Sequence, residues 1–374
     1  MKIVGVRLAM LRVPLKTPFK TALRTVESVE DVVVMVDTDT GHVGFGEAPA
    51  TAVITGDTHG SIIDAIRYYI APPLVGMEVA DLQRITRSVQ SALEKNTSAK
   101  AAVEIAVHDL WGQLHGAPLY KLLGGGDPVV TTDITISVNA IETMVADSIS
   151  AVDRGFGALK LKVGKDIAVD IERVKAIHAA VGGRALLRLD ANQGWTAKQA
   201  VSALLALEDA GIPLDLVEQP VKARDIAGLR YVSERVQTPV MADESAYGPL
   251  EVLELIRRQA ADIINIKLMK AGGISNALRM ADIASLHGIE CMMGCMLESS
   301  ISVAAAVHLA VARSDTITRI DLDGPSLCTF NPVVGGVVFD ESRISVPDDS
   351  GLGIRDVRGL EAITMPEACR GAGG

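Results

Sequence analysis

The chain has 374 residues, enough for two domains or for one barrel with an addition. Its formal net charge of -10 argues against a general affinity for nucleic acid or for acidic membranes. Hydrophobic residues make up 48% of the chain and aromatic residues only 3%, so the core must be built from aliphatic side chains. Such a composition is typical of α/β proteins with buried parallel strands.

The four cysteines are too few for a disulfide scaffold in so long a chain. Cys291 and Cys295 lie in an apolar run with no histidine nearby, and we expect buried thiols there rather than zinc ligands. Charged residues interrupt every apolar stretch near the N-terminus, and no segment is long and apolar enough to span a bilayer. These features favour a cytoplasmic protein with reduced thiols.

The first part of the chain predicts an antiparallel sheet. Two runs are apolar and rich in β-branched residues, 2–13 and 32–37, and the sequence DTDTG at 37–41 is typical of a hairpin turn. Two polar segments, 18–24 and 51–57, predict mobile connecting loops.

Helical patterning follows at 61–93 and 98–114. Three consecutive glycines before Pro128 indicate a domain junction, so we predict an α+β domain over residues 1–126.

From about residue 131 short apolar runs alternate with helical stretches roughly every 25 residues, the spacing of a βα unit. Eight runs predict strands, at residues 133–138, 158–163, 186–191, 215–219, 239–244, 262–268, 290–295 and 318–323. Eight parallel strands separated by helices most simply close into a barrel, predicted here over 127–325. A doubly wound open sheet is the alternative, but no strand is followed by a glycine-rich nucleotide loop.

After residue 325 the alternation stops. Residues 335–340 and 343–347 predict short strands that return to the first domain, so we assign 326–374 to a C-terminal segment that completes it.

Ionisable side chains stand at the ends of most predicted barrel strands, where the strands converge on one mouth. Three carboxylates, Asp190, Glu218 and Asp243, come from three successive strands and suit a hard divalent cation such as Mg²⁺. A helix N-cap explains any one of these acids well, but it explains three in succession poorly.

Lysines supply the second half of the pattern. Lys160 and Lys162 are two residues apart on one strand and share a face, and we expect the pair of like charges to lower the pKa of one of them. Lys267 lies four strands away and faces the mouth from the opposite side. Two lysines flanking one carbon can remove a proton from one face and return it to the other, which is the chemistry of racemisation or epimerisation. A cation at the adjacent carboxylate stabilises the charge that develops.

The chain resembles the enolase superfamily, muconate-lactonizing-enzyme subgroup, and within it the dipeptide epimerases. The motifs that carry the resemblance span nearly the whole barrel: LKLKVG at 159–164, RLDANQGW at 188–195, VEQPV at 217–221, MADES at 241–245, INIKLMKAGGI at 264–274 and DLDGP at 321–325. The resemblance implies a (β/α)7β TIM-like barrel covered by an α+β N-terminal capping domain. Sites of this superfamily combine a lysine or histidine base with Mg²⁺.

The resemblance also implies roles for the residues found above. Asp190, Glu218 and Asp243 would hold one Mg²⁺, Lys162 and Lys267 would be the two acid/base catalysts, and Lys160 would assist. A homo-oligomer is expected, because members of the family often form one.

Resemblance extends to the substrate. Asp321 and Asp323 match a pair of acids that in dipeptide epimerases hold the free α-ammonium of the substrate, although turn or capping acids are the alternative for Asp323. Arg24 matches the position that contacts the glutamate side chain in Ala-Glu epimerases. The segments TALRTV and VITGDT of the two specificity loops, at 19–25 and 52–58, also resemble those enzymes.

These matches predict a dipeptide substrate, L-Ala-D/L-Glu, with Glu298 near it. The sequence around Cys295, Ser299 and Ser300 need not match Ala-Glu enzymes, so epimerases of hydrophobic or cationic dipeptides remain an alternative. Further alternatives are o-succinylbenzoate synthase, N-acylamino-acid racemase and muconate cycloisomerase, which need no free substrate ammonium, and a non-catalytic barrel.

Overall fold

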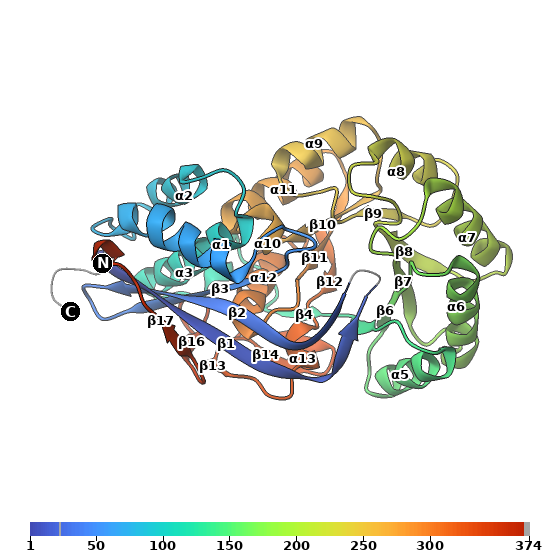
Figure 1. Ribbon diagram of the computed structural model, residues 1–374, viewed down its shortest axis with the longest axis horizontal. Helices are drawn as coiled ribbons and strands as arrows, with labels where there is room; N and C mark the ends of the chain where they lie inside the picture. Colours follow the sequence, from blue (N-terminus) through green and yellow to red (C-terminus); the bar gives the residue numbers. More distant parts are fainter. Residues whose placement is uncertain (22–23, 370–374) are drawn as a thin grey trace.

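A computed structural model of the protein describes residues 1–21 and 24–369. It contains an antiparallel sheet with helices on one side and a ring of parallel strands and helices beside it (Figure 1). Eight strands form the parallel sheet in strictly sequential order: β5 (Ile134–Ile136), β6 (Ala158–Lys162), β7 (Leu186–Asp190), β8 (Leu214–Glu218), β9 (Val240–Ala242), β10 (Ile263–Lys267), β11 (Glu290–Gly294) and β12 (Ile317–Asp321). All eight strands predicted from the sequence are therefore confirmed.

The two ends of this sheet meet. The amide of Asp133, just before β5, donates to the carbonyl oxygen of Ile320 on β12 at 3.2 Å, so the sheet curls into a nearly closed barrel. The predicted barrel is confirmed, and the doubly wound sheet is excluded by the sequential strand order.

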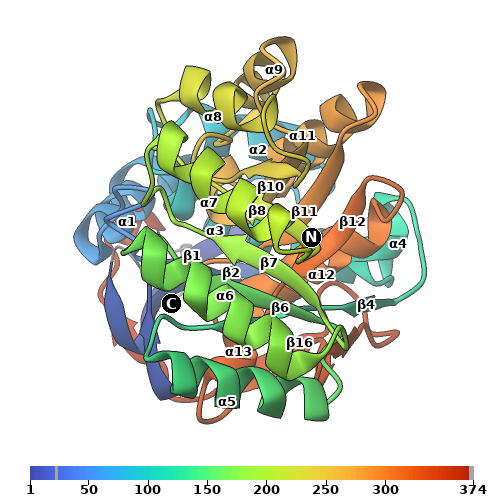
Figure 2. The same ribbon diagram turned by 90° about the vertical axis from the view of Figure 1, so that its right-hand side faces the viewer.

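Helices surround the barrel: α5 (Ile141–Asp153), α6 (Ile167–Val181), α7 (Ala197–Asp209), α8 (Ile226–Ser233), α9 (Pro249–Arg257), α10 (Leu268–Ala271), α11 (Ile274–Leu286), α12 (Ser300–Ala312) and α13 (Gly324–Leu327). Figure 2 shows α5, α6 and α7 side by side on its outer face. Local sequence places their starts: Asp166 caps α6, and Thr196 with Gln199 forms a capping box on α7. No described helix has the length and apolarity needed to cross a membrane.

A four-stranded antiparallel sheet forms the N-terminal part, in the order β17–β1–β2–β3. Its strands are β1 (Ile3–Lys20), β2 (Thr25–Thr38), β3 (Val43–Pro49) and β17 (Glu361–Ile363), and its helices are α1 (His59–Ala65), η1 (Ile66–Ile70), η2 (Pro72–Leu74), α2 (Leu82–Ser91), α3 (Thr97–His115) and α4 (Leu119–Leu123). The hairpin predicted at 37–41 joins β2 to β3, as expected.

Two sequence predictions need correction here. The segment 18–24 is not a loop from its start, because β1 continues to Lys20 and pairs with β2 as a long ribbon; Lys20 then contacts residues 137 and 138 beside β5. Residues 22 and 23 of the first specificity loop lie outside the described part.

The C-terminal strands also pair differently from the prediction. β14 (Val338–Asp340) and β15 (Arg343–Ser345) join β4 (Val129–Thr131) in a small sheet of their own. It is β17 that returns to the first sheet, beside β1. The remaining elements are β13 (Val333–Gly335), β16 (Ile354–Val357) and η3 (Glu367–Cys369). The domain boundaries at residues 126 and 325 stay a prediction.

Close packing between β3 and α3 depends on glycine. A Cβ atom at Gly46 would lie 1.8 Å from the carbonyl oxygen of Ala102 on α3, and one at Gly44 would lie 2.1 Å from that of Ala106. We therefore expect Gly46→Ala to lower the free energy of unfolding by about 1–3 kcal/mol or more, because overpacking forces the helix off the sheet. Urea unfolding would measure it. Gly157→Ala is the control, since a Cβ there meets nothing within 4 Å, and an equal loss in both variants would contradict the packing argument.

Candidate active site at the barrel mouth

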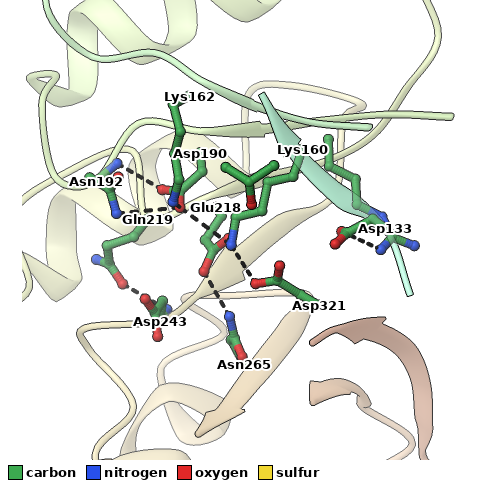
Figure 3. A network of polar contacts seen from close by, with 12 residues as sticks. Asp133, Lys160, Lys162, Asp190, Asn192, Glu218, Gln219, Asp243, Asn265 and Asp321 are labelled. Carbon is green, nitrogen blue, oxygen red and sulfur yellow. Dashed lines mark hydrogen bonds and ion pairs between the residues drawn. The ribbon is translucent and has the colours of Figure 1, made fainter. Parts of the chain in front are cut away.

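The register of the parallel strands brings the charged residues together. Lys162 on β6 is the register partner of Asp190 on β7, and Asp190 is the partner of Glu218 on β8. Asp243 follows β9 directly. Because these residues stand at the carboxyl ends of neighbouring strands, their side chains converge at one mouth (Figure 3).

One ammonium group ties this network together. Lys160 Nζ lies 2.6 Å from Asp321 Oδ2, 2.8 Å from Glu218 Oε2 and 3.5 Å from Asp190 Oδ2. Lys162 Nζ lies 2.5 Å from Asp190 Oδ2. All five side chains are buried, so each charge depends on its partners rather than on water.

The paired lysines are expected to lower the pKa of one of the two, and Lys160 is not that one. Burial alone would lower the pKa of Lys160, but the charges of Asp321, Glu218 and Asp190 outweigh it, and the pKa is raised well above its usual value. Burial acts to raise the pKa of Asp321, yet Lys160 and Lys267 bring it down to about 2. The sequence showed that the lysines are close together, but not that three acids surround one of them.

A second pair of cations holds Asp243. Its carboxylate lies 2.9 Å from Lys267 Nζ and 2.5 Å from Lys270 Nζ. These two lysines outweigh burial and depress the pKa of Asp243, whereas the pKa of Lys267 is raised, because Asp243 and Glu218 overcome the effect of burial. Lys270 also donates to the backbone carbonyls of Asp243 and Asn265, so it fixes the end of β9 against β10.

A cavity lies above this network and is covered by the N-terminal sheet. Of the predicted site residues, Lys160, Lys162, Lys267, Asp321, Asp323 and Arg24 line it. Val53 and Ile54 of the second specificity loop and the wall 295–297 complete much of the lining. The structure thus brings lysines from β6 and β10, on opposite sides of the barrel, to one space.

Asp321 and Asp323 face this space from the end of β12. Asp321 contacts Lys160, and Asp323 accepts a hydrogen bond from the amide of Thr135 at 2.7 Å. Burial and the neighbouring charge of Asp321 raise the pKa of Asp323 to about 6. A cationic group arriving beside the pair would favour its ionised form.

Glu298 lies below the cavity wall and is not among the residues that line the cavity. Its side chain is buried; it accepts a hydrogen bond from the Met296 amide at 2.6 Å, and its Oε2 lies 2.5 Å from the Ser302 hydroxyl oxygen. Its predicted contact with substrate stays a prediction.

Several buried polar residues escaped the sequence prediction. Gln219 links two strand ends, because its Oε1 accepts from the amides of Asp243 and Ser245. Asn265 donates to Glu218 at 2.7 Å, and Arg188 bridges Asp133 and Asp215 inside the barrel. Gln219 and Asn265 stand within the VEQP and INIK motifs, so their positions were visible but their partners were not.

The residues at the mouth fit a hard divalent cation in their donor chemistry. Three carboxylates are supplemented by Asn192 Oδ1, Asn265 Oδ1 and both carboxylate oxygens of Glu244, which are buried and accept no hydrogen bond from the described residues. Within residues 1–21 and 24–369, no group of three or more His, Cys, Asp or Glu is arranged as a ready metal site. Ammonium groups lie against the same carboxylates in this structure: Lys160 against Asp190 and Glu218, and Lys162 against Asp190.

Fold and site together define a barrel protein with ionisable groups gathered at its mouth, beneath a cover. Residues 144–356 match the model of the enolase C-terminal domain-like family, and residues 3–124 match the mandelate racemase / muconate lactonizing enzyme N-terminal domain. The chain therefore belongs to the mandelate racemase / muconate lactonizing enzyme family of the enolase superfamily, whose members use Mg²⁺.

Individual relatives are similar over almost their whole length. The L-Ala-D/L-Glu epimerase of Clostridium acetobutylicum is 53% identical, over 93% of this chain and 97% of the relative. The substrate-liganded L-Ala-D/L-Glu epimerase of Bacillus subtilis has a TM-score of 0.93 at 46% identity, over 97% and 100% of the two chains. The dipeptide epimerase of Enterococcus faecalis, solved with Mg and L-Leu-L-Tyr, has a TM-score of 0.92 at 43% identity, over 95% and 100%.

Replacing Lys160 tests the charge network directly. A carboxylate whose pKa is lowered in the folded protein stabilises the fold at pH values above its ordinary pKa, which is 3.8 for Asp321. This contribution is lost as the pH falls through the folded pKa, which is about 2 for Asp321. Lys160→Met removes the shared cation, so Asp321 will take up its proton at a higher pH. We expect the acid-unfolding midpoint to move to higher pH and the unfolding free energy at neutral pH to fall by about 3–5 kcal/mol.

Circular dichroism across an acid titration would measure both effects. Lys198→Met, which replaces an exposed lysine of α7, is the matched control. Coincident acid transitions of the two variants would show that Lys160 does not hold the network.

Proposed function

We propose that this chain epimerises dipeptides, with L-Ala-D/L-Glu as its substrate. The observation that carries the proposal is the cavity itself, in which Lys162 and Lys267 approach from opposite strands while Asp321 and Asp323 line the same space. The Ala-Glu epimerases of Clostridium acetobutylicum and Bacillus subtilis, similar over almost their full length, support the same activity.

Asp190, Glu218 and Asp243 would hold one Mg²⁺. When bound, the cation supplies positive charge beside the substrate carboxylate, where negative charge develops as the α-proton leaves. The buried oxygen atoms of Asn192, Asn265 and Glu244, which lack donors among the described residues, support a cation at this place.

Proton transfer falls to the two lysines. Lys162 on β6 and Lys267 on β10 lie four strands apart in the barrel, so they address opposite faces of a carbon held between them. One amine removes the α-proton of the C-terminal residue, and the opposite ammonium returns a proton to the other face. Lys160, held in its charged form by three acids, places a fixed positive charge beside the developing negative charge.

The cavity offers charged groups that complement the α-ammonium and the side-chain carboxylate of the dipeptide. Asp321 and Asp323 accept the free α-ammonium, which an acylated or lactone substrate lacks. Arg24 lines the cavity from the cover and can pair with the side-chain carboxylate of a C-terminal glutamate. The pair of acids therefore favours a dipeptide over the substrates of cycloisomerases.

A preference for hydrophobic dipeptides is the second candidate. Val53, Ile54, Met296 and Leu297 give the cavity a largely apolar flank close to Arg24. The Enterococcus faecalis relative was solved with L-Leu-L-Tyr, and the chain shares 43% identity with it.

Exchange of the α-proton tests the reaction. In D₂O with Mg²⁺, the protein should exchange the α-proton of the C-terminal residue of L-Ala-L-Glu, followed by NMR as loss of the proton signal. Lys162→Ala should slow exchange from one of the two epimers, L-Ala-L-Glu or L-Ala-D-Glu, by at least about 100-fold, because a positioned base contributes roughly that much or more and each lysine faces only one side of the α-carbon. Removing divalent cations with EDTA should abolish exchange.

Lys165→Ala provides the control, because Lys165 lies three residues further along and is exposed. Wild-type exchange from both epimers in the Lys162→Ala protein would refute the assigned base. No exchange on any dipeptide would refute the epimerase proposal and direct the search to cycloisomerase substrates.

Arg24 is tested by selectivity rather than by total activity. Arg24→Met should raise KM for L-Ala-L-Glu roughly 10- to 100-fold, the effect of losing a hydrogen bond to a charged group, and leave KM for L-Ala-L-Leu nearly unchanged. Steady-state kinetics on both dipeptides would measure the ratio. Equal changes on the two substrates would mean that Arg24 does not read the glutamate carboxylate.

A further inference from the structure

Helix α12 begins in a place that water does not reach. Residues 300–311 are all buried, so the free N–H groups of its first turn need partners from the protein itself. Ser299 caps one of them, since its hydroxyl accepts from the amide of Ile301 at 3.3 Å. The amides of Ser299 and Ser302 require an acceptor from elsewhere.

Glu47 of β3 supplies that acceptor across the interface between the sheet and the barrel. Its Oε1 accepts from the Ser299 amide at 3.2 Å and its Oε2 from the Ser302 amide at 3.2 Å, and the side chain is fully buried. A carboxylate placed at a helix N-terminus is stabilised by the N–H groups and by the helix dipole. The cover is thus fastened to the start of α12 by one acidic side chain.

The hydroxyl of Ser302 joins Glu47 to a second acid. Its Oγ lies 2.9 Å from Glu47 Oε2 and 2.5 Å from Glu298 Oε2. A hydroxyl carries a single hydrogen and cannot donate to two ionised carboxylates at once. One of the two acids must therefore be protonated and donate to Ser302, while Ser302 donates to the other.

Glu298 is the better holder of that proton. Glu47 receives two backbone N–H groups, which favour negative charge on it, whereas Glu298 Oε1 receives one, from Met296. Burial, with the charge of Glu47 adding to it, raises the pKa of Glu298 to about 7. The order of donation is therefore Glu298 to Ser302 to Glu47.

Charged and titratable groups from four directions face this pair. They are Asp31 of β2, Lys267 of β10, Cys295 of the same loop and Cys328 after α13. Burial, the charge of Glu47, a hydrogen bond with Glu47 and the charge of Glu298 raise the pKa of Asp31 well above its usual range. Burial raises the pKa values of both thiols and keeps them neutral. Lys267 alone among them favours ionised Glu298.

The consequence reaches the substrate cavity. Residues 295–297 form part of its wall, and Glu298 holds them by accepting from the Met296 amide. We propose that Glu47 and Glu298, joined through Ser302 by a shared proton, are positioning residues that set the cavity wall 295–297 against the cover and so determine how tightly the substrate is held. The role in substrate binding rests on the proposed function, whereas the shared proton and the position of the wall do not.

Three readouts test this proposal. Glu47→Gln keeps the shape of the side chain but turns an NH₂ group toward an amide donor, so KM for the dipeptide should rise at least roughly ten-fold with a smaller change in kcat. Glu361→Gln, an exposed acid on β17, is the matched control. Ser302→Ala breaks the link without replacing either acid and guards against misfolding of the first variant.

Position of the wall is measured without substrate. Cys295 lines the cavity, so its alkylation by iodoacetamide, read by peptide mass spectrometry, should accelerate several-fold in Glu47→Gln and Ser302→Ala relative to Glu361→Gln. The buried Cys291 serves as an internal reference in every sample.

Infrared spectroscopy tests the proton itself. In the wild-type spectrum, the carbonyl band of a protonated carboxyl group should fade as the pH rises through about 7. The spectrum of Glu298→Gln should lack this band. In the same pH window KM of the wild type should rise, and this dependence should be lost in Glu298→Gln, whose amide carries a permanent donor.

Each outcome decides a separate point. Control-level Cys295 alkylation in both Glu47→Gln and Ser302→Ala, or an unchanged carboxyl band in Glu298→Gln, would overturn the positioning proposal. If no dipeptide is turned over by the wild type, the proposed function fails, while alkylation and infrared spectra still decide for or against the shared proton.

Discussion

The ammonium group of Lys160, held among Asp321, Glu218 and Asp190, is the interaction on which the barrel mouth depends. Four buried charges in water-poor surroundings are tolerable only as a compensated set. Strand register enforces this compensation, because Lys162, Asp190 and Glu218 stand side by side at the ends of β6, β7 and β8. The same strand register therefore closes the barrel and brings the ionisable groups together, so a change of register would disturb both.

A cover completes the site from the other end of the sequence. The β1–β2 ribbon reaches the edge of the barrel, where Lys20 contacts residues 137 and 138, and Arg24 lines the cavity. Glu47 fastens β3 to the start of α12. The cavity residues of the cover thus rest on a sheet whose glycines bring it close to α3, and whose edge is closed by β17.

Much of this arrangement was readable from the sequence, because periodicity and strand ends are local properties. The eight barrel strands are predicted by the βα repeat of about 25 residues. Lys162, Asp190 and Lys267 are recognisable because they are charged residues within apolar strands. Partners distant in the chain were not readable. No local pattern around Glu47 predicts its contact with Ser302, 255 residues away. No local pattern in β14 and β15 predicts that they pair with β4 rather than with the first sheet. The raised pKa of Lys160 was not predictable for the same reason, since it depends on three acids from other strands.

The raised pKa values of Lys160 and Lys267 have a further physical meaning. They arise because carboxylates that suit a divalent cation are paired here with ammonium groups. One carboxylate cannot fully neutralise a divalent cation and an ammonium group at the same time. Whatever takes the charge of Asp190, Glu218 or Asp243 away from the lysines lowers the lysine pKa values toward the range in which an amine can act as a base. The carboxylates that stabilise these buried ammonium groups as ion pairs therefore also control whether an amine at the barrel mouth can act as a base.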